Sequence, residues 1–294
     1  MTAQIINGRE VADSIFQEVA EEAAQMKAQH GIVPGLSVVL VGEDPASVSY
    51  VTGKDKACAR VGFRSYPHKI PSNYPEIDLI TLVHELNKHP DIDGILVQVP
   101  LPKHIDETKV LLAIDPEKDV DGFHPFNLGR LILGQETYKP CTPAGIQELL
   151  LRSGAQIEGA DVVIVGRSNI VGKPIAVMLF QKAAGANATV TVTHTRTRDL
   201  ASHTRRADIL IVAAGKPRGV TADMIKPGAT VIDVGVNRMG YTKEGKAKLC
   251  GDVDFAAACE VAGRITPVPG GVGPMTIAML MKNTLKSAKR RIKD

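Results

Sequence analysis

The stretch A-D-V-V-I-V-G-R-S-N-I-V-G-K-P, residues 160–174, decides the fold that we expect for this chain. Its β-branched run, residues 161–165, ends abruptly in a glycine-bearing turn, which is typical of a buried parallel strand that leads into a helix. The first N–H groups of a helix lack intrahelical partners, and Gly166 and Gly172 would let a phosphate approach the main chain. The stretch therefore indicates an anion site. Because its spacing departs from G-x-G-x-x-G, an ordinary strand-to-helix turn is the alternative interpretation.

The segments that follow favour a dinucleotide as the anion. Residues 188–194, 207–215 and 229–236 have the composition of three further strands, with helix-length segments between the early ones. Together with residues 161–165 they make half or more of a doubly wound sheet. The second half of the chain is therefore expected to be a Rossmann-type α/β domain.

The residues after the second of these strands predict NADP rather than NAD. In NAD-selective folds an acidic residue accepts hydrogen bonds from the ribose at this point, whereas here the chain reads T-H-T-R-T-R. Arg196 and Arg198 would tolerate a 2′-phosphate, and Arg167, beside Gly166, could reach the same group through paired donors. The alternative is that these arginines are solvated surface charges.

Composition excludes several classes of protein. The 294 residues suffice for about two domains, and a net charge of +3 with 4% aromatic residues and no Trp gives no nucleic-acid platform. The four cysteines form no C-x-x-C pair and have no histidine at metal-ligand spacing, so we expect reduced thiols and no metal site. No signal peptide or run of about 18 apolar residues is present, so we expect a cytoplasmic enzyme without a membrane partner.

The first half of the chain also alternates strands and helices. Helical patterns cover residues 11–29, 45–61, 76–88 and 106–114, and strand patterns cover residues 36–41, 64–70 and 94–99. This alternation predicts a mostly parallel sheet with helices on both faces, in which ligands gather at the carboxyl ends of the strands.

Three polar features lie at or near such strand ends. Tyr50 and Lys54 are four residues apart and share one helix face, Gln98 interrupts an apolar strand, and Asp121 lies in a glycine-bearing loop. Each also has a structural explanation: a surface lysine, a hydrogen-bonded core glutamine and an aspartate that caps a turn. Gly53, between Tyr50 and Lys54, is locally costly in a helix and would allow close packing.

Two segments are expected to connect the halves. Thr142 is a natural N-cap and Pro143 a natural first helical residue, so a helix should begin there. Near the end, residues 267–276 contain three glycines and three prolines, and Thr276 should open the final helix, residues 277–287. The glycines of this loop offer close backbone approach to a flat ligand.

Six motifs, in this order, make the chain resemble the bifunctional methylenetetrahydrofolate dehydrogenase/cyclohydrolase family over essentially its full length. They are Y-x-x-x-K at 50–54, V-Q-V-P-L-P at 97–102, D-P-x-K-D-V-D-G at 115–122, P-C-T-P-x-G at 140–145, G-R-S-x-x-V-G-x-P at 166–174 and P-V-P-G-G-V-G-P-M-T at 267–276. The resemblance implies a homodimer and a cleft between two α/β domains. A catalytic, folate-binding domain would comprise residues 1–141 and 276–294, and an NADP-binding domain residues 142–275.

The resemblance also implies roles for individual residues. The substrates would be tetrahydrofolate derivatives. Lys54 would move protons during hydrolysis, and Gln98 would orient the Lys54 amine. Tyr50 would stack on the aminobenzoyl ring, and Asp121 would accept hydrogen bonds from the amino edge of the pterin. A lysine that acts as a base at neutral pH needs a lowered pKa, from desolvation or from a cation such as Lys56. The pterin or nicotinamide would be lined by Pro269, Gly270 and Gly273.

For NADP, the resemblance implies Gly166, Arg167 and Ser168 in the phosphate turn, Thr195 after the second strand and Val236 in D-V-G-V-N. Thr195 departs from the Ser or Arg common in relatives, which bears on how the 2′-phosphate is held, and Val236 replaces a common Ile. Two other hypotheses fit the architecture: another two-domain NADP dehydrogenase, of the shikimate or amino-acid type, and a non-catalytic nucleotide-binding sensor.

Overall fold

The computed structural model describes residues 2–241 and 247–292, and the chain divides into two compact units. The six-stranded unit comprises Met1–Ala12 and Thr142–Thr276, and the three-stranded unit comprises Asp13–Cys141 and Ile277–Asp294. The sequence prediction places residues 1–12 in the first domain. Residues 2–12 pack in the six-stranded unit instead, because β1 (Gln4–Ile5) pairs in parallel with β11 (Arg264–Ile265).

The six-stranded unit is built on a parallel sheet with strand order β1-β11-β8-β7-β5-β6. Its central strands are β5 (Asp161–Val165), β6 (Thr189–Thr193), β7 (Ile209–Val212) and β8 (Thr230–Asp233). The strands β5, β7 and β8 consist mainly of β-branched and leucine residues, and most of their side chains are buried. This composition is typical of parallel strands that are covered on both faces.

Strand β5 lies at the point where the chain reverses its direction across the sheet. After β5 the chain first adds β6 on one side and then β7 on the other, so that Val165 pairs with Thr193 and with Val212. In open α/β sheets ligands bind at such a reversal, outside the carboxyl ends of the strands. The turn that follows β5 therefore lies where the sheet topology favours a ligand.

The helix α6 (Cys141–Arg152) leads into this unit, and the elements that follow it around the sheet are short. They are α7 (Gly172–Phe180), α8 (Leu200–Thr204), η1 (Ala222–Met224), α9 (Phe255–Ala258) and an antiparallel pair, β9 (Asn237–Tyr241) and β10 (Ala247–Cys250). Sequence patterns had not indicated this strand pair.

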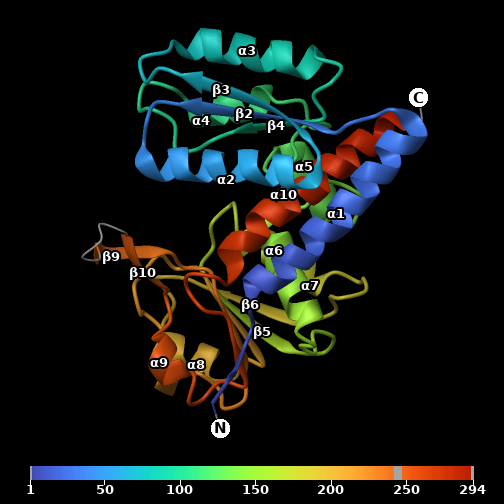
Figure 1. Ribbon diagram of the computed structural model, residues 1–294. Coiled ribbons are helices and arrows are strands. Elements are labelled where there is room, and N and C mark those ends of the chain that lie inside the picture. Colours follow the sequence, from blue (N-terminus) through green and yellow to red (C-terminus); the bar gives the residue numbers. More distant parts are fainter. Residues whose placement is uncertain (1, 242–246, 293–294) are drawn as a thin grey trace. The chain divides into compact units, whose positions relative to one another are not determined.

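The three-stranded unit has a parallel sheet with strand order β3-β2-β4. Its strands are β2 (Gly35–Val41), β3 (Arg64–Ile70) and β4 (Gly94–Val97), and its helices are α2 (Pro45–Val61), α3 (Glu76–Lys88), α4 (Glu107–Ala113) and α5 (Pro125–Ile132). Within this unit α2 and α3 lie on opposite sides of the sheet (Figure 1). Strands and helices alternate as the sequence predicted, and the carboxyl ends of β2 and β4 lie side by side.

The core of this unit forms between β2, β4 and the helices α3 and α4. Val39, Val97, Leu79, Val83 and Val110 belong to one buried apolar cluster there. Alternate residues of a strand point to opposite faces, so the remaining buried residues of β2 face α2. The sheet therefore holds α2 in place by burial of its apolar side.

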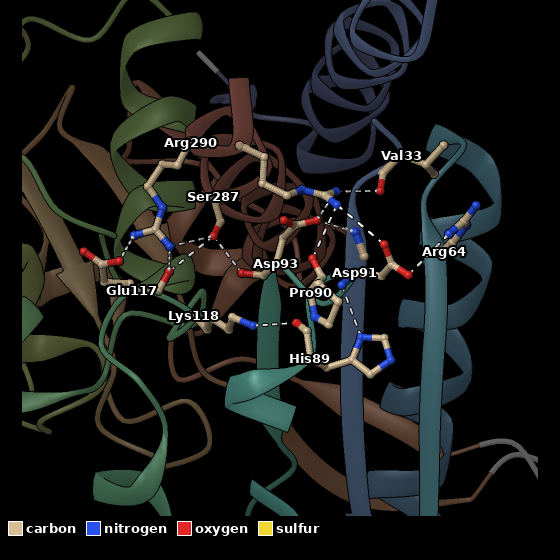
Figure 2. Close-up of polar contacts among 12 residues, drawn as sticks. Val33, Arg64, His89, Pro90, Asp91, Asp93, Glu117, Lys118, Ser287 and Arg290 are labelled. Atoms are coloured by element: carbon tan, nitrogen blue, oxygen red, sulfur yellow. Dashed lines mark hydrogen bonds and ion pairs between the residues drawn. The ribbon is translucent and has the colours of Figure 1, made fainter. Parts of the chain in front are cut away.

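Two long helices lie across the division of the chain: α1 (Gly8–His30) and α10 (Val272–Ala288), and η2 (Lys289–Ile292) follows α10. In the three-stranded unit, the end of α10 and the η2 turn are joined to the start of β4 by polar contacts (Figure 2). Ser287 donates a hydrogen bond to the backbone oxygen of Asp93 at 2.6 Å, and the Arg291 guanidinium contacts the Asp93 carboxylate at 2.9 Å. No helix within the described ranges is long and apolar enough to cross a membrane.

Three boundaries differ from the sequence prediction. Helix α6 begins at Cys141, so Thr142 lies in its first turn rather than at the N-cap, and its hydroxyl is 3.0 Å from that of Thr276. Helix α10 begins at Val272 rather than after Thr276, because the second part of the glycine-rich stretch is helical. Strand β4 ends at Val97, so Gln98 follows the strand instead of interrupting it.

Candidate functional site

Lys54 lies on α2 in the three-stranded unit, and its side chain is buried. The Asp44 carboxylate caps the start of the helix by accepting from the Ser47 N–H at 2.9 Å, and Gly62 ends it in a left-handed conformation. Lys54 is only 7% exposed. A surface lysine keeps its ammonium in water, so the structure rejects the surface explanation for this residue.

The Lys54 amine is oriented by Gln98, at the carboxyl end of β4. Lys54 Nζ donates to Gln98 Oε1 at 2.8 Å, and Gln98 Nε2 donates to the Val99 carbonyl at 2.8 Å. The second hydrogen bond fixes which end of the amide faces the lysine, because only the oxygen can accept. Gln98 is therefore placed to hold the amine.

Asp121 lies in a loop whose shape is fixed by its neighbour Asp119. The Asp119 carboxylate accepts from the backbone N–H groups of Gly122, Phe123 and His124 and from the Asn127 amide, at distances of 2.8–3.3 Å. The capping role proposed for Asp121 from its sequence thus belongs to Asp119. The carboxylate of Asp121 is left to interact with Lys54 and Cys141.

Burial tunes the titration of this cluster. It lowers the pKa of Lys54, whereas the electrostatic interactions of the amine with Asp121 and Cys141 act to raise that pKa. It raises the pKa of Asp121 to about 6, although Lys54 acts in the opposite direction, and it raises the pKa of the Cys141 thiol well above its usual value. Lys56, which the sequence offered as a second cause for Lys54, is exposed and plays no part in the shift.

Tyr50 and Gly53 complete this face of α2. Tyr50 lies one turn before Lys54 and is 46% exposed, so its ring is accessible to a ligand. At Gly53 a Cβ atom would meet the end of the Ile277 side chain at 3.4 Å, an ordinary contact distance. The close approach proposed for Gly53 is therefore a contact with α10.

The turn after β5 is as tight as its glycines suggested. Gly166 has φ +134°, and a Cβ there would lie 2.2 Å from the Ala213 carbonyl oxygen; at Gly172 a Cβ would lie 2.3 Å from the Gly166 oxygen. Ser168 Oγ accepts from the N–H groups of Val171 and Gly172 at 3.1 and 3.3 Å, which ties the turn to the start of α7. Both glycines are therefore required by close backbone packing, of the turn against the residue after β7 and of the turn against itself.

The end of β6 lies beside this turn and carries exposed cations. The N–H of Gly166 donates to the Thr193 carbonyl at 2.9 Å, which joins the two strand ends. Thr195, Arg196 and Arg198 are exposed after β6, and Arg167 is exposed after β5. The arginines on which the sequence prediction of NADP rests are therefore exposed after the ends of β5 and β6.

Two buried aspartates near this site were missed by sequence reasoning. The Asp252 carboxylate accepts from the N–H groups of Ala214 and Gly215 at 2.7 and 2.8 Å, and from the Asn237 amide at 2.8 Å. Asp233, at the end of β8, accepts from the N–H of Asp252 at 2.9 Å, and burial raises its pKa to about 6. They join the loops after β7 and β8, where Val236 is 55% exposed. The sequence held one signal for them: Asp233 ends the otherwise apolar strand β8.

The loop before α10 carries the remaining predicted residues. Pro269 is exposed, and Gly270 has φ +106°, which favours glycine. Gly273 is exposed in the first turn of α10 rather than in the loop. The structure thus brings Lys54, Gln98 and Asp121 together in the three-stranded unit, whereas the predicted loop and cofactor residues belong to the six-stranded unit.

The site contains no evident metal ligands. Within residues 2–241 and 247–292, no group of three or more His, Cys, Asp or Glu side chains is arranged to hold a metal ion. All four cysteines are free thiols, and Cys58, Cys141 and Cys259 are buried. The titratable groups that interact with the Lys54 amine are the carboxyl of Asp121 and the thiol of Cys141.

Comparison with known families gives two matches that together cover most of the chain. Residues 6–121 match the tetrahydrofolate dehydrogenase/cyclohydrolase catalytic domain, and residues 140–292 match the tetrahydrofolate dehydrogenase/cyclohydrolase NAD(P)-binding domain. Lys54, Gln98 and Asp121 fall within the first match, and the turn at Gly166 falls within the second.

Individual relatives agree along the whole length. The bifunctional protein FolD of Syntrophus aciditrophicus is 64% identical over 98% of both chains. The solved FolD methylenetetrahydrofolate dehydrogenase/cyclohydrolase of Campylobacter jejuni is 46% identical, with a TM-score of 0.92 over 98% of this chain and 99% of that one. The Trypanosoma brucei enzyme, solved with NADP and an inhibitor, is 42% identical, with a TM-score of 0.94 over 100% of both. With both family matches, this identity establishes that the chain belongs to the tetrahydrofolate dehydrogenase/cyclohydrolase family.

Proposed function

We propose that this chain oxidises 5,10-methylenetetrahydrofolate to 5,10-methenyltetrahydrofolate with NADP+ and hydrolyses the product to 10-formyltetrahydrofolate. One observation carries the proposal: a buried lysine amine, hydrogen-bonded to Gln98 and facing Asp121, lies at the carboxyl ends of parallel strands in a chain of this family. Membership of the family weighs against a shikimate-type dehydrogenase and a non-catalytic sensor.

The oxidation needs little acid–base chemistry from the protein. When bound, NADP+ supplies the hydride acceptor. The one-carbon unit lies between two nitrogens, so the cation left after hydride loss is delocalised over both. The contribution of the side chains is to bind and orient the folate at reacting distance.

The hydrolysis requires proton transfer, which we assign to Lys54. Water adds to the methenyl carbon and gives up a proton, the bond from that carbon to N5 breaks, and N5 takes up a proton. An amine whose pKa is lowered by burial has a larger neutral fraction near pH 7 than an exposed lysine, so it can accept the proton from water. The hydrogen bond that the Lys54 amine donates to Gln98 would keep the lone pair of the amine directed at the substrate.

The remaining folate contacts follow from side-chain chemistry. Asp121 would accept hydrogen bonds from the amino edge of the pterin, and in its ionised form both carboxyl oxygens are acceptors. The exposed ring of Tyr50 would stack on the aminobenzoyl group. We assign Pro269, Gly270 and Gly273 to the lining of the pterin or nicotinamide, because exposed glycine and proline backbone allows a flat ring to approach.

For the cofactor we propose Gly166, Arg167 and Ser168 around the phosphates, Thr195 at the ribose and Val236 against the base or nicotinamide. The preference for NADP over NAD rests on the arginines at the ends of β5 and β6. The NADP-bound state of the Trypanosoma brucei relative supports the same choice.

We also propose that the enzyme is a cytoplasmic homodimer with no nucleic-acid or membrane partner. The mildly basic charge and the scarcity of aromatic residues support the absence of nucleic acid. The family resemblance supports the dimer, which sedimentation of the purified protein would test: a species of one chain mass at micromolar concentration would contradict it.

The activity is tested by following the absorbance of methenyltetrahydrofolate. We expect its formation from methylenetetrahydrofolate with NADP+, a higher Michaelis constant with NAD+, and its disappearance by hydrolysis faster than in buffer. A protein that reduces shikimate-type substrates, or binds NADP with neither folate reaction, would refute the proposed function.

A further inference from the structure

Asn283 is a buried amide on α10 that bridges two other segments of the three-stranded unit. Its side chain is 7% exposed. Asn283 Nδ2 donates to the Val120 carbonyl at 2.8 Å and to the Lys139 carbonyl at 3.0 Å, and it lies 3.7 Å from Cys141 Sγ. Buried backbone carbonyls need donors, so one side chain here satisfies two segments far from it in the sequence.

The two bridged segments carry groups of the candidate site. Val120 directly precedes Asp121, and Lys139 lies two residues before Cys141. Cys141 Sγ donates to the Val120 carbonyl at 3.4 Å, and the thiol also hydrogen-bonds to the Asp121 side chain. At Gly122 a Cβ would meet Pro140 N at 2.7 Å, so the segments are already in close contact.

Further hydrogen bonds hold α10, and the η2 turn after it, against the same part of the unit. Ser287, four residues after Asn283 and on the same helix face, donates to the Asp93 and Glu117 carbonyls at 2.6 and 3.2 Å, and Arg290 donates to the Glu117 carbonyl at 2.7 Å. Figure 2 shows Ser287 and Arg290 converging on Glu117. The segment from Glu117 to Asp121 is therefore tied to α10 near both of its ends.

We propose that Asn283 is a positioning residue for folate binding: by holding the Val120 and Lys139 carbonyls, it sets the place of the Asp121 carboxyl relative to Lys54. This inference rests on the role proposed above for Asp121. Asn283 itself need not touch the substrate. Without its amide, the two backbone segments lose their common donor, and the carboxyl of Asp121 loses its fixed position beside the amine.

The test uses Asn283→Leu, which keeps a side chain of similar size but has no donor. We expect its Michaelis constant for methenyltetrahydrofolate to rise about tenfold. A displaced Asp121 would lose a hydrogen bond between its charged carboxylate and the pterin, and such a bond contributes about that factor. We expect NADP binding to stay within about twofold of the wild type, because the cofactor residues belong to the other unit. The pH dependence of the folate Michaelis constant should also shift, because the surroundings of Asp121 change.

Thr284→Val is the matched control. Thr284 is the next residue of α10, it is fully buried, and its hydroxyl bonds only to the Leu280 carbonyl of the same helix among the hydrogen bonds described for it. We expect this variant to lose stability without a change in the folate Michaelis constant or its pH dependence. Should Asn283→Leu fail to fold, Asn283→Ala, which also lacks the donor, takes its place with the same expected results.

Asp121→Asn separates this inference from the proposed function. If Asp121→Asn leaves the folate Michaelis constant unchanged, the role of Asp121 fails whatever Asn283 does. If Asp121→Asn has its effect but Asn283→Leu behaves like Thr284→Val, Asn283 is merely structural and the inference is overturned. If the inference holds, Asn283→Leu adds less to Asp121→Asn than it does to the wild type.

Discussion

Lys54 and Asp121 would carry opposite charges in water, yet burial disfavours the charged form of each. The pKa of Lys54 is lowered and the pKa of Asp121 is raised to about 6, while the attraction between the two groups acts against both shifts. A neutral amine can accept a proton, and an ionised carboxyl can accept hydrogen bonds from a pterin. Near neutral pH the pair can therefore supply both functions from one small cluster.

The titration of Asp121 predicts a pH dependence for folate binding. Asp121 is protonated below about pH 6 and ionised above it. The ionised carboxyl offers both oxygens as acceptors, whereas the protonated carboxyl carries a donor on one of them, so binding should weaken as pH falls through this value. From pH 7.5 to pH 5 we expect the folate Michaelis constant of the dehydrogenase reaction to rise about tenfold, following the ionised fraction.

The variant Asp121→Asn is the control for this effect, because its amide does not titrate. Its folate Michaelis constant should be high and nearly independent of pH over the same range. A wild-type constant that stays flat between pH 5 and pH 7.5 would count against the assigned role of Asp121.

The arginines after β5 and β6 give a second prediction at this scale. In Arg167→Ala and Arg196→Ala we expect the Michaelis constant for NADP+ to rise about 10- to 100-fold, the usual value of a charge-assisted hydrogen bond, and the constant for NAD+ to change little. Hydrolysis of methenyltetrahydrofolate is the internal control and should keep its wild-type rate. Equal losses with both cofactors would mean that these arginines do not recognise the 2′-phosphate.

Helix α2 presents Tyr50 and Lys54 at the cost of an interior glycine. Gly53 has room for a methyl group, since a Cβ would meet only the flexible end of Ile277, at 3.4 Å. We expect Gly53→Ala to stabilise the protein by about 0.5–1 kcal/mol through helix propensity, measured as the free energy of unfolding in denaturant.

Gly145→Ala is the contrasting variant. Gly145 is also an interior helical glycine, but there a Cβ would lie 2.7 Å from the Cβ of Met275. We expect this change to destabilise the protein, since an atom so near the backbone cannot move aside. If both variants had the same sign, space around the glycine would not be the deciding factor.

At the level of elements, periodicity and glycine placement predicted most of the regular structure. The boundaries of α3, β3 and β5 agree with the sequence patterns, because each has a clear period and a polar or glycine-bearing end. Helix α5 was missed because it is short and contains a glycine, and β9 and β10 were missed because their alternation is weak. The early start of α10 could not be foreseen, since glycine and proline normally mark loops.

Part of the candidate site could also be predicted from the sequence. Lys54, Gln98 and Asp121 stand in motifs that sequence alone brings to attention, and hydrogen bonding and burial unite them. Asp252, Asp119 and Asn283 support the sites through backbone contacts made by distant segments. No local sequence pattern reports such contacts, so they required the structure.

At the scale of the whole molecule, the two units divide the chemistry. The amine, its amide partner and the carboxyl belong to the three-stranded unit, and the glycine turn with its arginines belongs to the six-stranded unit. The family matches divide the chain in the same sense, into a catalytic and an NAD(P)-binding domain. A change in one set should therefore spare the binding function of the other.

The most direct test is the cyclohydrolase rate of Lys54→Met, measured beside its affinity for NADP. Methionine keeps much of the apolar stem of lysine but cannot accept a proton. We predict that hydrolysis of methenyltetrahydrofolate falls by at least about 100-fold, the usual contribution of a general base, while the dissociation constant for NADP stays within about twofold. Hydrolysis at the wild-type rate in this variant would contradict the assignment of proton transfer to Lys54.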